Sequence, residues 1–298
     1  MYDSVLVPTD GSDHAARVAG HALGLARWFD ATVHVVSVVD VSAAGGVFDA
    51  GGVSPAFVER LEDEAAAAIE RIETMTDTDR VRSAVLKGSP AATILEYADE
   101  NDVDLIAMGT HGRTGVNRYL TGSVTERVVR QSDVPVMTAR VTERSEWAGG
   151  YDEILLPTDG SEPAAAAVDH ALAIATRADA TVHVVSVVDV STVAGRPTIV
   201  APNDILAQFE SDAETAVETV AATVRDAGLD VETHVRKDIP SQGLLEYVDD
   251  HDIDLVTMGT HGRTGFDRVL LGSTTERFVR RAPVPVLAVH PTAGSEPN

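Results

Sequence analysis

Residues 103–126 read VDLIAMGTHGRTGVNRYLTGSVTE, and residues 253–276 read IDLVTMGTHGRTGFDRVLLGSTTE. Each stretch passes from an apolar, strand-like run through a glycine-rich turn into Gly-Ser and the start of a helix. A second landmark repeats as well, because Pro8-Thr9-Asp10-Gly11-Ser12 returns as Pro157-Thr158-Asp159-Gly160-Ser161. Self-similarity at half the chain length indicates that the 298 residues are a tandem duplication.

The duplication predicts two domains, residues 1–141 and 151–298, joined by a polar linker over 142–150. Within each copy, short β-branched runs alternate with helix-length, alanine-rich runs, which is typical of βαβ units and a parallel sheet. We expect an α/β fold with two tandem doubly wound, Rossmann-like domains, each with a five-stranded parallel sheet. In the first copy the pattern predicts strands near 3–8, 32–39, 80–86, 103–108 and 134–139, and helices near 12–29, 56–74, 90–101 and 120–132.

The chain is strongly acidic, with 47 Asp and Glu against 23 Lys and Arg, and a net charge of −24. Such a surface repels phosphate backbones and anionic membranes, so we expect neither nucleic acid nor membrane as a partner. Lys87 and Lys237 are the only lysines. This acid-rich, lysine-poor composition favours a halophilic protein, in which strong salt screens self-repulsion; an ordinary acidic cytosolic protein is the alternative.

Cysteine and long apolar segments are both missing from the sequence. Without cysteine there is no disulfide framework, no thiolate zinc site and no cysteine nucleophile. No apolar run approaches the ~20 residues that cross a bilayer, and the first residues do not have the pattern of an export signal. We therefore expect a cytoplasmic protein.

The glycine-rich turns are candidate phosphate-binding loops. Glycines let the backbone approach an anion closely, and the helix that begins near Gly122-Ser123 offers unpaired N–H groups. The alternative is plain turn chemistry, with Ser123 and Glu126 forming a capping box. Because both copies keep the arrangement, we favour the binding site, with Arg113 and Arg263 placed to neutralise phosphate. His111 and His261 have no neighbours at metal-ligand spacing, so we interpret them as packing residues.

Asp10 and Asp159 end the first strand of each copy, at the same sheet edge as the glycine loop. A carboxylate there can accept hydrogen bonds from ribose hydroxyls or hold a divalent cation beside phosphates. The alternative is that each aspartate caps the following helix. Position beside a candidate phosphate loop favours the binding role.

Three well-known catalytic signatures are missing. There is no G-x-x-x-x-G-K-[ST], so the lysine that serves the β- and γ-phosphates in P-loop enzymes is absent and rapid ATP hydrolysis is not expected. No G-x-S-x-G marks a hydrolase nucleophile, and no G-x-G-x-x-G follows the first strand. Slow ATP hydrolysis or phosphoryl transfer, and a nucleotide-free interaction scaffold, remain alternative functions.

Both halves resemble the universal stress protein family almost end to end. Its ATP-binding members carry G-2x-G-9x-G-[ST], which this chain matches in each copy. The first copy of the motif is Gly109, Gly112, Gly122 and Ser123, and the second is Gly259, Gly262, Gly272 and Ser273.

The resemblance implies a nucleotide-dependent stress-response protein with ATP in each half and Mg²⁺ or Mn²⁺ assisting. It implies that Asp10 and Asp159 meet the ribose or the metal, that Val38 and Val187 touch adenine, and that the loop glycines with Ser123 and Ser273 hold the phosphates. The neighbouring residues Pro8, Val124, Pro157 and Thr274 belong to the same expected sites. It also implies that the fifth strands, 134–139 and 284–289, pair as an internal pseudo-dimer; a further homodimer and the identity of a protein partner stay open.

Overall fold

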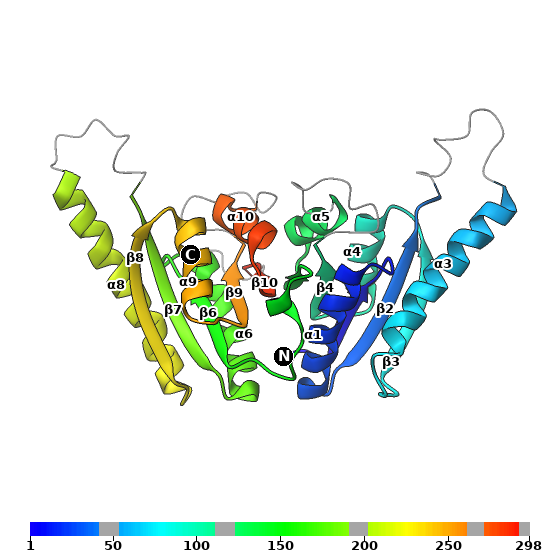
Figure 1. Cartoon of the computed structure of the whole chain (residues 1–298), viewed down its shortest axis with the longest axis horizontal. Helices are drawn as coiled ribbons and strands as arrows, with labels where there is room; N and C mark the ends of the chain where they lie inside the picture. The colour runs from blue at the N-terminus through cyan, green and yellow to red at the C-terminus, as the bar shows by residue number, and fades with distance from the viewer. Residues whose placement is uncertain (42–53, 111–122, 191–201, 261–270, 292–298) are drawn as a thin grey trace. The chain divides into compact units, whose positions relative to one another are not determined.

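A computed structural model describes residues 1–41, 54–110, 123–190, 202–260 and 271–291. It divides into two compact units, Met1–Trp147 and Ala148–Asn298. Each unit repeats the same order of strands and helices (Figure 1).

The first unit contains a five-stranded parallel sheet in the order β3-β2-β1-β4-β5. Its strands are β1 (Ser4–Pro8), β2 (Thr32–Val39), β3 (Val81–Lys87), β4 (Leu105–Gly109) and β5 (Val136–Ala139). The chain winds outward from β1 to β3, then returns to the other side of β1 through β4. The direction of winding therefore reverses between β1 and β4, beyond whose carboxyl ends ligands bind in such sheets.

Four helices connect these strands: α1 (Asp13–Phe29), α3 (Pro55–Glu73), α4 (Pro90–Glu100) and α5 (Ser123–Gln131). Because crossovers between parallel strands are right-handed, the helices that precede the reversal of winding cover one face of the sheet, and the helices that follow it cover the other. Accordingly α1 packs with α3, and α4 packs with α5. Helices on both faces explain why β1 is buried along its whole length.

The second unit repeats this plan in the order β10-β9-β6-β7-β8. Its strands are β6 (Glu153–Pro157), β7 (Thr181–Asp189), β8 (Val231–Asp238), β9 (Leu255–Gly259) and β10 (Val286–Val289). Its helices are α6 (Glu162–Ala178), α8 (Pro202–Asp226), α9 (Pro240–Asp250) and α10 (Ser273–Arg281). The predicted fold class, two tandem doubly wound α/β domains, is confirmed.

The segment after β5 folds onto α1 of the first unit. A short 3₁₀ turn, Glu143–Ser145, begins with a capping box between Thr142 and Ser145. The His21 ring nitrogen Nε2 lies 2.9 Å from the Ser145 carbonyl oxygen. Trp147 packs against α1 at Gly20 and Gly24, where a side chain would meet its own. The sequence predicts a linker over 142–150, whereas the described structure places residues 142–147 within the first unit.

No helix among the described residues is both long and apolar enough to cross a membrane.

Candidate functional site

The turn after β1 holds Asp10 beyond the carboxyl end of this strand, where the direction of winding reverses between β1 and β4. Gly11 has a φ of 79°, which a glycine adopts without strain, and the Asp10 carboxylate accepts a hydrogen bond from the Ser12 N–H at 3.0 Å. Ser12, not Asp10, is the N-cap of α1, because its side chain accepts from the Ala15 N–H. The capping alternative for Asp10 is therefore wrong.

The second unit builds the same turn. Gly160 has a φ of 76°, and Asp159 Oδ1 accepts from the Ser161 N–H at 3.0 Å and the Ser161 hydroxyl at 2.5 Å. Ser161 caps α6 by accepting from the Ala164 N–H. In both copies, capping is done by the serine, so helix capping does not account for the aspartate.

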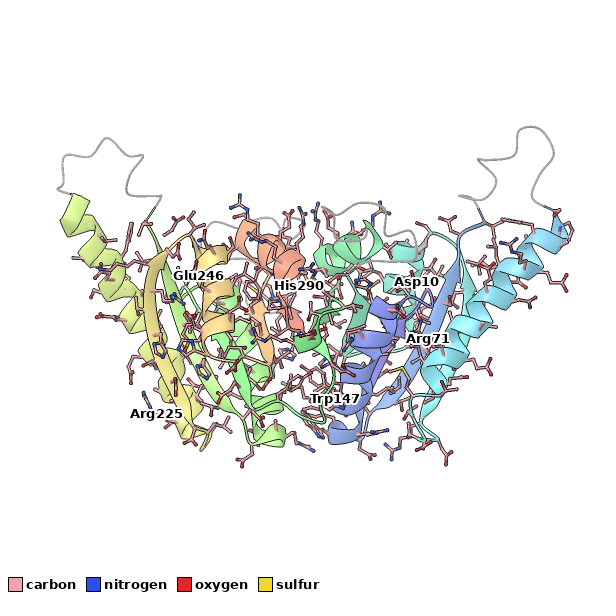
Figure 2. All side chains as sticks on the ribbon, in the orientation of Figure 1. Asp10, Arg71, Trp147, Arg225, Glu246 and His290 are labelled. Carbon is pink, nitrogen blue, oxygen red and sulfur yellow. The ribbon has the colours of Figure 1, made fainter. Side chains whose placement is uncertain are left out.

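Arg71 is a residue of this region that sequence reasoning missed. From the last turn of α3 it donates to the Gly11 carbonyl at 2.7 Å and to the Asp13 carboxylate at 2.6 Å. The hydrogen bond and charge of Arg71 lower the pKa of Asp13. Arg71 lies near Asp10 on the first unit (Figure 2) and fixes the turn that carries it. No sequence motif marks it, because it comes from a helix 60 residues away.

Gly109 and Gly259 end β4 and β9 against the first turn of α1 and α6. A Cβ on Gly109 would lie 2.6 Å from a backbone carbon of His14, and one on Gly259 would lie 2.3 Å from the Pro163 carbonyl oxygen. Both positions therefore require glycine for close strand–helix packing. This packing brings the start of each glycine-rich turn beside the turn that carries the aspartate.

The helix after the glycine loop begins differently from the capping-box interpretation. In the second unit α10 begins at Ser273, followed by Thr274; Gly272 is its N-cap, without a side-chain hydrogen bond. The helix is instead tied to the sheet by Thr275, whose hydroxyl donates to the Gly259 carbonyl at 2.9 Å. The first backbone N–H groups of α10 thus have no side-chain cap among the described residues, which leaves them available to an anion.

In the first unit α5 begins at Ser123 and continues through Val124, and the Thr125 hydroxyl donates to the Gly109 carbonyl at 2.7 Å. Several predicted loop residues lie outside the described residues: Gly112, Arg113, Gly122, Gly262, Arg263 and the histidines His111 and His261. Their roles stay predictions.

The residues predicted on the nucleoside side lie on neighbouring strand ends. Pro8 and Pro157 are the last residues of β1 and β6, and the N–H that follows each proline donates to the adjacent strand. Val38 lies near the end of β2; Val187, on β7, packs partly buried against the core. Because β1 pairs with β2, and β6 with β7, in parallel, these carboxyl ends lie on the same side of the sheet as the aspartate turns.

The described residues contain no group of three or more His, Asp or Glu side chains that could hold a metal ion. Asp10 and Asp159 are thus single carboxylates rather than parts of a protein cage. One carboxylate with phosphate oxygens and water is the ligand set that suits Mg²⁺.

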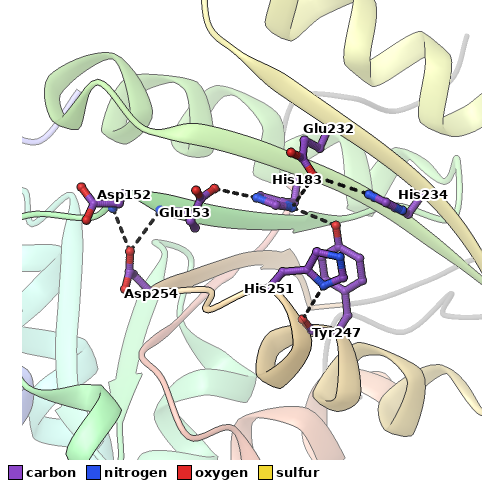
Figure 3. A network of polar contacts seen from close by, with 8 residues as sticks. All are labelled: Asp152, Glu153, His183, Glu232, His234, Tyr247, His251 and Asp254. Atoms are coloured by element: carbon purple, nitrogen blue, oxygen red, sulfur yellow. Dashed lines mark hydrogen bonds and ion pairs between the residues drawn. The ribbon is translucent and has the colours of Figure 1, made fainter.

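Figure 3 shows a polar cluster in the second unit, whose residues Glu153 and His183 lie near the starts of β6 and β7. The buried His183 ring contacts the Glu153 carboxylate at 2.6 Å through Nε2 and the Tyr247 hydroxyl at 2.8 Å through Nδ1. His251 stacks on Tyr247 with ring centroids 3.8 Å apart, and Glu232 lies 3.7 Å from His183. Burial, with the Glu232 charge, raises the pKa of Tyr247.

The first unit keeps only the centre of this cluster, the pair of His34 and Tyr97 at 2.9 Å. The positions that match Glu153, Glu232, His234 and His251 hold Ser4, Arg82, Ala84 and Asn101. Glu153 and His183 lie near the starts of β6 and β7, far along the strands from the aspartate turn. The cluster is therefore separate from the candidate nucleotide site.

Comparison with known proteins gives a consistent family match. The model of the universal stress protein family matches residues 1–140 and again 150–290. A universal stress protein of Methanocaldococcus jannaschii is 38% identical over 142 residues, which is 47% of this chain and 83% of that protein. The crystal structure of a universal stress protein from Archaeoglobus fulgidus covers 98% of this chain and 97% of its own, with a TM-score of 0.70 at 21% identity, and so agrees in fold.

Proposed function

The chain belongs to the universal stress protein family, and from that premise we propose that each unit binds one adenine nucleotide, with ATP as the ligand. The protein then acts in the cytoplasm as a stress-response module through nucleotide occupancy rather than turnover. One observation carries the proposal: in both copies an aspartate that does not cap the helix lies at the reversal edge of the sheet, beside the start of the glycine-rich turn.

The nucleoside is proposed to lie over the ends of β1 and β2, or β6 and β7. There Asp10 or Asp159 accepts hydrogen bonds from the ribose hydroxyls, and Val38 or Val187 packs against the base. Both aspartates are held by a local hydrogen bond to the backbone two residues on, so little side-chain entropy is lost when a ligand binds.

The triphosphate is proposed to meet backbone N–H groups at the start of α5 and α10, with Ser123, Ser273 and the loop glycines as further donors. The uncapped first turn of α10 supports this part of the proposal, because its N–H groups and helix dipole favour an anion. Arg113 and Arg263 would supply positive charge in a chain that is otherwise acidic.

Mg²⁺ or Mn²⁺ fits this donor set, because a single aspartate can share the ion with phosphates and water. Bound there, the ion would neutralise phosphate charge. No lysine stands where P-loop enzymes use one, which favours retention of the nucleotide over its hydrolysis. Pairing of residues 134–139 with 284–289 remains a prediction.

The test is to denature the purified protein and assay the supernatant for adenine nucleotide. We expect about two nucleotides per chain, still as ATP after hours of incubation. The double variant Asp10→Asn with Asp159→Asn should lose them. Asp3→Asn with Asp152→Asn is the matched control, because these exposed aspartates lie at the opposite end of the same strands. Nucleotide-free protein that also fails to bind added Mg-ATP would contradict the proposal, and steady phosphate release would replace occupancy with a slow ATPase.

A further inference from the structure

The first unit contains a groove along α1 that the nucleotide site does not use. It has a volume of about 470 Å³, within the range of small-molecule sites, and lies between α1, the end of α3 and the segment that follows β5. Leu23, Met75, Val141 and Trp147 provide its apolar lining. We refer to it as the α1 groove.

The apolar lining includes surfaces that an acidic soluble protein would normally cover. Met75 is 39% exposed and Val141 is 42% exposed. A Cβ on Gly24 would lie 2.2 Å from the Trp147 ring. The absence of a side chain at Gly24 therefore lets the indole pack directly on the helix backbone. Trp147, shown at the foot of α1 in Figure 2, thus gives the groove a flat aromatic wall.

Arginines surround this apolar lining. Arg17 pairs with Glu146 at 3.2 Å, and Arg71 pairs with Asp13 at 2.6 Å. Arg27, in the last turn of α1, makes no ion pair with any residue in the part of the chain that the structure describes. Its planar guanidinium is therefore available for a carboxylate, sulfonate or phosphate.

The groove is not part of the duplicated design. In α6, the positions that match Arg17 and Arg27 are Ala166 and Thr176. The only basic residue of α8 is Arg225, which pairs with Glu218 at 2.6 Å. The aspartate turn is kept in both units while these residues are not, so the arginines of the groove have no counterparts in the second unit.

We propose that the α1 groove binds a small organic anion, with an aromatic or apolar body against Trp147 and an acidic group on Arg27. Charge complementarity selects this occupant. Glu146 and Asp13 also line the groove and offset Arg17 and Arg71, so its net positive charge comes from Arg27. One guanidinium, unpaired among the described residues, beside exposed apolar side chains favours an anion with an apolar body over a cation or a purely hydrophilic ion.

The test is calorimetric titration of the full chain as purified with 2-naphthalenesulfonate and with the neutral 2-naphthol, with no nucleotide added, at fixed ionic strength. We expect one sulfonate per chain and at least tenfold weaker binding of 2-naphthol. Arg27→Ala should weaken sulfonate binding at least fivefold, whereas Arg177→Ala, in the last turn of α6, should leave it unchanged.

A second pair of variants adds charge without removing an arginine. Val141→Asp should abolish sulfonate binding by repulsion, whereas Val190→Asp, at an equally exposed valine in the second unit, should not. No sulfonate binding up to millimolar concentration, equal affinity for the neutral compound, or equal loss in each variant and its control would overturn the proposal. Because no nucleotide is added and neither Arg27 nor Val141 belongs to a proposed nucleotide site, this outcome is independent of the function proposed above.

Discussion

Acidification should destabilise the first unit through His21. The imidazole is buried beneath the segment that follows β5, with its Nε2 against the Ser145 carbonyl and its ring 5.4 Å from the Trp147 centroid. Burial lowers the pKa of His21 from 6.5 to about 4, although the Ser145 hydrogen bond opposes the shift. The folded protein therefore keeps His21 neutral at pH values where the unfolded chain protonates it.

The sign follows from proton linkage. Between pH 6.5 and pH 4 the unfolded state binds a proton at His21 that the folded state does not, so the free energy of unfolding falls as pH falls through this window. One pKa unit corresponds to about 1.4 kcal/mol, and the shift therefore costs about 3 kcal/mol of stability by pH 4. Above pH 6.5 both states are neutral and the contribution vanishes.

Urea unfolding at pH 7.5, 6.5, 5.5 and 4.5, followed by tryptophan fluorescence at constant ionic strength, measures this effect. Both tryptophans, Trp28 and Trp147, lie in the first unit and contact each other. His21→Gln keeps an N–H donor but cannot titrate, so its unfolding free energy should fall less on acidification than that of the natural chain. His234→Gln, at a ring 41% exposed, serves as the control. Equal pH dependence of His21→Gln and the natural chain would refute burial as the cause.

Three further outcomes are expected. Gly259→Ala should lower the melting temperature, with a cost of about 1–3 kcal/mol, because its Cβ would overlap the backbone of α6; an unchanged melting temperature would contradict the packing described. Tyr247→Phe should cost about 1 kcal/mol in urea unfolding by removing the hydrogen bond to buried His183, and no loss would mean that the bond contributes nothing. Arg71→Ala should weaken nucleotide binding at the first site by up to about fivefold in a two-site titration, with the second site as internal control; equal weakening of both sites would exclude the turn contact as the reason.

The fold was predictable because periodicity and duplication are local signals. Continuous apolar runs marked the buried strands, and the repeat of Asp10-Gly11-Ser12 showed that both halves share one plan. The predicted α1 region, 12–29, agrees with Asp13–Phe29 because Ser12 caps it and Asp30 ends it in a left-handed conformation.

The details of the site were less predictable because they depend on residues brought together by the fold. Arg71 donates to the Gly11 carbonyl from the end of a separate helix, and Trp147 packs against Gly20 and Gly24 of α1. Neither contact follows a sequence spacing from which it could be predicted. Helix capping stayed open as an alternative role for Asp10 because aspartate and serine are both good caps, and only the geometry distinguishes them.

The measurement that bears most directly on the proposed function is native mass spectrometry of the full chain titrated with Mg-ATP. Two bound nucleotides per chain in the natural protein, counting any that co-purify, and one in Asp10→Asn or Asp159→Asn alone, are the predicted result. A chain that stays free of nucleotide at saturating Mg-ATP would contradict the assignment of the two aspartate turns as nucleotide sites.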